Sequence, residues 1–182
     1  MKLLSSLLMC FLLILVMFTA GCADNINENV SNQNTEKAPK LNLTVVPEKT
    51  ELNKGESFNI NLQLRNVGNN TLNIWIMEQQ ISYDISFRSL ADNNYATYLG
   101  PVIERPLLTN EFLVELKPGE SLNATYNCRS WDLNPGEYIL SAVYHTVSGE
   151  RISKPYWLGE IKSNEVVIKV REAQNNLTAP TL

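Results

Sequence analysis

Histidine and cysteine, the residues that most often bind metals or act as nucleophiles, are scarce in this chain. Its 182 residues include one histidine, His145, and three cysteines, Cys10, Cys22 and Cys128. A His-Glu-x-x-His zinc helix needs two histidines one turn apart, and a Ser-His-Asp triad needs a nucleophile beside an oriented base. Neither pattern is present. We therefore expect a protein that is not an enzyme and that holds no metal or cofactor.

An excess of positive charge is also missing. Fifteen Lys and Arg residues stand against 19 Asp and Glu residues, a formal net charge of −4. Mild acidity of this kind argues against binding to nucleic acid or to an anionic membrane surface. No segment keeps a 3.6-residue apolar period over three turns, which argues against a helical domain.

The first 22 residues carry an export signal. Lys2 precedes an almost entirely apolar run over residues 3–18, which small residues follow up to Gly21. This order is typical of a secretory signal peptide, and the run is short for a spanning helix, which needs about 20 residues. Two alternatives stay open for this segment: an ordinary secretory signal in which Cys22 occurs by chance, and a membrane anchor that is not cleaved.

Residues 19–22, Thr-Ala-Gly-Cys, resemble the lipobox of prokaryotic lipoproteins, with threonine where most lipoboxes carry an aliphatic residue. The resemblance implies cleavage before Cys22, a diacylglycerol on its sulfur, and an exported protein anchored by lipid on the extracytoplasmic face of the cell membrane. Cys10 would leave with the signal, so that Cys128 is the one thiol of the folded part. A disulfide framework is then excluded.

The chain divides into four segments. We expect a signal peptide over residues 1–21, a polar, asparagine-rich disordered tether over 22–40, a folded domain over 41–172 and a flexible tail over 173–182. Removal of the signal leaves 161 residues with a net charge of −5, since Lys2 is the only charge lost. That length suits one domain with a sizeable core.

Alternation of apolar and polar residues dominates the expected domain. Seven runs show it, over residues 41–45, 58–65, 72–76, 83–88, 122–128, 138–144 and 166–170. Pro47 ends the first run, and turn residues such as Gly68-Asn69-Asn70 and Pro118-Gly119 separate others. The pattern predicts an all-β fold, an antiparallel β-sandwich of about 7–9 strands. The Pro135-Gly136-x-Tyr138 sequence resembles the start of the penultimate strand in immunoglobulin-like and fibronectin-like domains.

A longer stretch is more specific. Its features are Tyr98-Leu99-Gly100-Pro101, Arg105, the run from Leu116 to Ser121, Asp132-Leu133 and Pro135-Gly136-x-Tyr138. They resemble the immunoglobulin-like β-sandwich domain that precedes the catalytic domain of deuterolysin-type (aspzincin) metallopeptidases. The resemblance covers residues 41–172 and implies an accessory role without peptidase activity, because the zinc helix is absent. The Pro-Gly-Glu and Pro-Gly-x-Tyr turns give a looser resemblance to BsuPI-like proteinase inhibitor domains.

Tyr98, Gly100, Pro101 and Arg105 are expected to organise the long connection across the sandwich. Gly100 stands where a side chain is expected to be unwelcome, since glycine alone reaches many positive-φ conformations at little cost. Pro101 would stiffen the turn, and Arg105 offers five donors to loop carbonyls or to a carboxylate. We expect a structural role for this element first and partner binding second.

Five Asn-x-Ser/Thr sequons are candidates for N-glycosylation: Asn29, Asn42, Asn69, Asn123 and Asn176. An asparagine-rich composition explains them equally well.

The remaining chemically interesting residues have ordinary interpretations. We expect His145 to face solvent, Cys128 to be a buried inert thiol, and Asp84, Asp92 and Asp132 to be solvated charges, because they lack the spacing of a calcium loop. Trp75 and Met77 give the strand near residue 74 a second apolar face, which either a loop covers or a partner binds. The loop aromatics Tyr95, Tyr98, Tyr156 and Trp157 either plug the core or bind a ligand.

These observations favour a membrane-anchored surface lipoprotein that displays a non-enzymatic binding module for a protein or glycan partner. The alternative is an extracytoplasmic proteinase inhibitor with residues 100–110 as its inhibitory loop. An enzyme with an unfamiliar site is the third hypothesis.

Overall fold

The computed structural model describes residues 40–173 except residues 105 and 150. The expected signal peptide, tether and tail, together with Cys22, Asn29, Arg105 and Asn176, therefore lie outside the described residues. Within them, no helix is long and apolar enough to cross a membrane. The described part contains ten strands: β1 (Leu41–Pro47), β2 (Glu51–Asn53), β3 (Asn59–Asn66), β4 (Leu72–Trp75), β5 (Tyr83–Ser89), β6 (Leu113–Leu116), β7 (Ser121–Asn127), β8 (Gly136–His145), β9 (Glu160–Lys162) and β10 (Val166–Arg171). Two short 3₁₀ helices, η1 (Asn110–Phe112) and η2 (Cys128–Ser130), flank β6 and β7.

The first sheet has the order β1-β3-β7, with both ladders antiparallel. Strand β3 shows why it forms: Ile60, Leu62 and Leu64 are at most 1% exposed, and the residues between them face solvent. Alternating apolar residues bury one face of a strand and leave the other in water, which fixes the register.

The second sheet has the order β2-β10-β8-β5, and β9 also pairs with β8. The chain leaves the first sheet after Pro47 and enters the second as β2, which pairs with β10 in parallel; the other ladders are antiparallel. The predicted antiparallel sandwich thus contains one short parallel ladder, at the edge of the second sheet where β2 lies.

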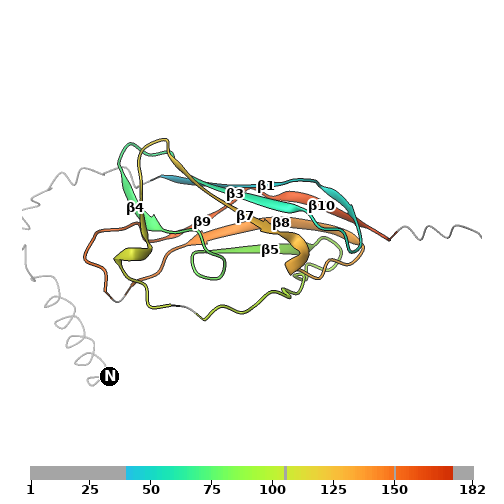
Figure 1. Ribbon diagram of the computed structural model, residues 1–182. Coiled ribbons are helices and arrows are strands. Elements are labelled where there is room, and N and C mark those ends of the chain that lie inside the picture. Colours follow the sequence, from blue (N-terminus) through green and yellow to red (C-terminus); the bar gives the residue numbers. More distant parts are fainter. Residues whose placement is uncertain (1–39, 105, 150, 174–182) are drawn as a thin grey trace, which may run out of the picture. The chain divides into compact units, whose positions relative to one another are not determined.

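The core lies between these two sheets (Figure 1). Rings from both sides meet there: Phe58 packs edge-on against Phe87 at 6.4 Å, and Tyr126 against Tyr83 at 5.2 Å. The hydroxyl of Tyr138 donates to the carbonyl oxygen of Asn134 at 3.0 Å, four residues upstream. This bond is the tyrosine corner of immunoglobulin-like sandwiches. The all-β, immunoglobulin-like fold class predicted from the sequence is confirmed.

The ladder between β3 and β7 is interrupted and resumes as β4 paired with β6. The buried side chain of Asn66 holds the interruption. Its Nδ2 donates to the carbonyl oxygens of Asn70 and Leu116, at 2.8 and 2.9 Å, and its Oδ1 accepts from the backbone N–H of Gly68 at 2.9 Å. Asn66 thereby joins two turns, the one that follows β3 and the one that follows β6.

The seven predicted strand runs are all present, and β2, β6 and β9 add to them. The edge of β1 has a protecting group that the sequence did not reveal. Asn164 accepts from the backbone N–H of Val45 at 2.8 Å and donates to the carbonyl oxygen of the same residue at 3.1 Å. A side-chain amide thus takes the place of a neighbouring strand, which guards this edge against other chains.

Candidate functional site: an apolar loop and the pocket beside it

A rigid turn precedes β5 and aims Gln80 outward. The carbonyl oxygen of Glu78 accepts from the backbone N–H of Ser82, whose hydroxyl in turn accepts from the N–H of Glu78 at 3.0 Å. Gln80 itself has a φ of 65°, a conformation uncommon for a residue with a side chain. The backbone N–H of Gln80 donates to the carbonyl oxygen of Tyr83 at 2.9 Å. The turn therefore presents the Gln80 amide in one fixed direction.

That amide holds the loop that we call the apolar loop, residues 99–104. Gln80 Nε2 donates to the carbonyl oxygen of Pro101 at 2.8 Å, and Oε1 accepts from the backbone N–H of Ile103 at 2.9 Å. One side chain thus satisfies the backbone on both sides of Val102, much as a neighbouring strand would. The segment around Val102 is therefore ordered even though it lies outside both sheets.

The apolar loop exposes aliphatic side chains. Val102 is 89% exposed, Leu99 64% and Ile103 43%. Within the described residues, no hydrogen bond engages the backbone N–H or C=O of Val102. Ordered, exposed aliphatic residues with free backbone groups can contact another molecule without first having to be ordered.

Trp131 fixes the start of this loop. The Tyr98 ring meets Trp131 at 5.2 Å, and the backbone N–H of Leu99 donates to the carbonyl oxygen of Ser130 at 2.7 Å. A side chain was expected to be unwelcome at Gly100, and the reason is not a positive φ, which this residue does not adopt. A Cβ at Gly100 would instead lie 2.2 Å from the Tyr98 hydroxyl. Glycine is needed here because the tyrosine ring lies over it.

The rest of the long connection, residues 106–112, is less available. Leu108 is buried, and Asn110 exchanges hydrogen bonds with Ser153, through Nδ2 to the serine hydroxyl and from the serine N–H to Oδ1. Leu107 is 45% exposed, so the sheltered part of the predicted inhibitory segment, residues 100–110, begins only at Leu108.

A pocket of about 190 Å³ adjoins the apolar loop at one end of the sandwich. Leu99 contributes to its wall, together with Glu56, Cys128, Arg129 and Trp131. The walls combine apolar surface with two basic side chains, Lys54 and Arg129, and two acidic ones, Glu56 and Asp132. Such a lining suits a small amphipathic group rather than a large ligand.

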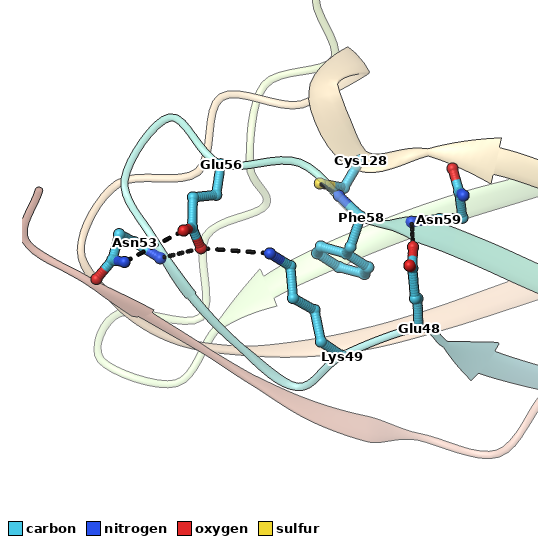
Figure 2. A network of polar contacts seen from close by, with 7 residues as sticks. All are labelled: Glu48, Lys49, Asn53, Glu56, Phe58, Asn59 and Cys128. Atoms are coloured by element: carbon cyan, nitrogen blue, oxygen red, sulfur yellow. Dashed lines mark hydrogen bonds and ion pairs between the residues drawn. The ribbon is translucent and has the colours of Figure 1, made fainter.

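Figure 2 shows the polar network around Glu56, one of the residues that line this pocket. The Glu56 carboxylate accepts from the backbone N–H of Asn53 at 2.9 Å, from the Asn53 amide at 3.3 Å and from Lys49 Nζ at 3.3 Å. The Asn53 backbone N–H is the main reason that the pKa of Glu56 is lowered, and the Asn53 amide and Lys49 add to the effect. The carboxylate therefore stays ionised at neutral pH and caps the turn before β3.

Cys128 is buried, as predicted. Its Sγ accepts from the backbone N–H of Phe58 at 3.2 Å, and burial raises the pKa of the thiol. A reactive thiol has a lowered pKa and an exposed position. The free thiol of Cys128 thus contributes to the packing of the core.

The other residues considered for catalysis or metal binding are spread over the surface. His145 is half-buried rather than fully solvent-facing, because its Nε2 lies 3.0 Å from Asp84 Oδ2. Asp92 bonds the backbone and side chain of Asn94, and Asp132 is exposed. Among the residues that the structure describes, no group of three or more His, Cys, Asp and Glu side chains could hold a metal ion.

A loop covers the second apolar face of β4. Trp75 is 1% exposed, its Nε1 donates to the carbonyl oxygen of Val147, and the Tyr156 ring lies 5.2 Å away. Trp157 is stacked on Tyr144, a buried residue whose hydroxyl donates to the carbonyl oxygen of Trp75. Of the four predicted loop aromatics, three therefore pack on the core, and Tyr95 remains 66% exposed.

Comparisons with solved structures find several chains that resemble this one. No family model matches the chain, and no curated protein matches it. The chain is similar to the solved CARDB domain of the PF1109 protein from Pyrococcus furiosus, determined in complex with di-metal ions. The two share 13% identity with a TM-score of 0.42, over 76% of this chain and 99% of that one. The finer resemblances to aspzincin and BsuPI-like domains stay predictions.

Proposed function

We propose that this protein is a non-enzymatic binding module, anchored through a lipid on Cys22 to the extracytoplasmic face of the membrane, whose apolar loop binds a protein partner. The ordered exposure of Val102 carries this proposal. The accessory role implied by the aspzincin resemblance agrees with it, and so does the leader that ends in Thr-Ala-Gly-Cys.

Two physical points support the loop as the binding element. Exposed aliphatic side chains that cluster on one loop are typical of an interaction site, and Val102 and Leu99 lie well outside the core. The two hydrogen bonds from the Gln80 amide to Pro101 and Ile103, which we call the clamp, hold the loop in place. Little conformational entropy would therefore be lost on binding. The neighbouring pocket offers Arg129 and Glu56 for the polar rim that such interfaces carry.

Replacing Val102 with aspartate is expected to abolish partner capture, because a charge at the tip would have to be desolvated in the interface. The measurement is chemical cross-linking in membranes followed by mass spectrometry of the captured protein. Val167→Asp is the matched control, since Val167 is 52% exposed on β10 and lies outside the apolar loop. Equal capture by both variants would show that the loop is not the binding element.

The anchor is tested separately. A Cys22→Ser chain is expected to leave the membrane fraction or to remain unprocessed, because a hydroxyl cannot take the thioether-linked lipid. Fractionation and intact mass of the two chains give the answer. A variant that is processed and retained like the original chain would refute lipid anchoring.

A second candidate function, inhibition of an extracytoplasmic proteinase, is favoured by the clamp itself. Gln80 supports the backbone on both sides of Val102, which leaves this one residue free to enter a substrate pocket. Incubation with a proteinase that cleaves after small aliphatic residues distinguishes the two functions. An inhibitor would form a stable complex with an intact loop, whereas a simple binding module would be cleaved or ignored.

A further inference from the structure

We propose that Asn42 carries an N-linked glycan whose first sugar lies in a groove against Trp157. The inference rests on the proposed extracytoplasmic location, because N-glycosylation takes place on exported chains. It concerns a different face of the domain from the apolar loop.

The sequon at Asn42 is exposed to solvent. Asn42 lies on the solvent face of β1, which is an edge strand of the first sheet, and its side chain is exposed. In an extended strand, residues i and i+2 share a face. Asn42 Nδ2 accordingly donates to the Thr44 hydroxyl at 3.2 Å, the one hydrogen bond this amide makes within the described residues. The amide and the hydroxyl of the sequon are thus side by side and accessible.

The second observation is the groove beside it. An open groove of about 590 Å³ is lined by residues 40–42, Val67, Trp157, Glu160 and Ile161. Its volume is within the range of sites for small ligands, about 300–1,000 Å³. Asn42 is one of the lining residues and is exposed, so a sugar attached to its amide would start beside the groove.

The lining fits a sugar. Trp157 is half-buried, with its ring stacked on Tyr144 at 6.0 Å, and so part of the indole stays available to the groove. An aromatic ring can pack against the apolar face of a sugar, while Lys40 and Glu160 can bond its hydroxyl groups. Val67, 49% exposed, would be covered as well. The other two described sequons, Asn69 and Asn123, do not contribute to this groove.

The test uses the chain from residue 22 onward, secreted from yeast behind a yeast leader, so that export is imposed. Peptide mass spectrometry after enzymatic deglycosylation in ¹⁸O water is expected to find Asn42 modified. Thr44→Ala should remove the modification, and Thr44→Ser, which preserves the sequon, should retain it. An unmodified Asn42 in the secreted chain overturns the proposal. A modified Asn42 together with a failed Cys22→Ser test refutes the membrane location alone.

Tryptophan quenching tests the packing. Trp75 and Trp131 are 1% and 6% exposed, so acrylamide quenching of the native protein reports Trp157. The glycosylated chain is expected to show a quenching constant about twofold lower than that of Thr44→Ala, because the sugar covers the exposed part of the ring. Asn123→Gln, a sequon change outside the groove, should leave quenching unaltered. Equal quenching with and without the glycan on Asn42 would refute contact with Trp157.

Discussion

Asn66→Ala is expected to lower the free energy of unfolding by about 3 kcal/mol, since it removes three hydrogen bonds and strands a buried acceptor. The carbonyl oxygen of Leu116 receives its bond from Asn66 Nδ2 in the interior, and Asn66 is 0% exposed. Water cannot easily replace the lost donor at such a position. Urea unfolding followed by tryptophan fluorescence measures the change.

Two variants sharpen this experiment. Gln63→Ala changes an exposed residue of the same strand, whose side-chain amide donates to Asn123 Oδ1 at 3.4 Å. This change should cost under about 0.5 kcal/mol. Asn66→Asp keeps the size and the acceptor but loses both donations and buries a carboxylate. Because the protonated form is favoured by burial, part of its lost stability should return as the pH falls. If Asn66→Ala is no worse than Gln63→Ala, the two turns are held by their backbone alone.

The strands could be predicted because burial of one face leaves a period of two in the sequence. Strand β3 is the clearest example, with Ile60, Leu62 and Leu64 on one face. The same parity places Asn66 on the core face, two residues before Gly68. A polar residue at an apolar position before a turn was the available signal for its structural role. Strands β2 and β9, three residues each, are too short to show a period.

The candidate site was only partly predictable. Pro101 and Pro106 marked an irregular segment in the sequence, and Tyr98, Gly100 and Pro101 were expected to organise it. The clamp was not foreseeable, because Gln80 lies 21 residues before Pro101 and nothing in the local sequence pairs them. Contacts of this kind depend on how two distant turns are brought together by the sheets. The same reason hid Asn164, which is 119 residues from Val45.

Trp131→Ala is the second change with a large expected effect, a loss of about 4 kcal/mol, typical of removing a buried tryptophan. The indole packs against Phe87 at 5.4 Å and against Tyr98 at 5.2 Å, so its removal leaves a cavity between the second sheet and the long connection. Denaturant unfolding gives the stability change. Trp131→Phe keeps an aromatic ring and should lose substantially less.

The same variant separates stability from loop order. Since Tyr98 rests on Trp131, removing the indole should free the tyrosine ring and loosen the start of the apolar loop, while Gln80 still holds Pro101 and Ile103. Proteolysis under native conditions, by an enzyme that cleaves after small aliphatic residues, should therefore become faster at Val102 in Trp131→Ala and faster still when Gln80→Ala is added. Unchanged cleavage in Trp131→Ala would mean that the Gln80 amide alone orders the loop. Unchanged cleavage in the double variant would contradict the clamp and, with it, the preorganisation on which the proposed binding function depends.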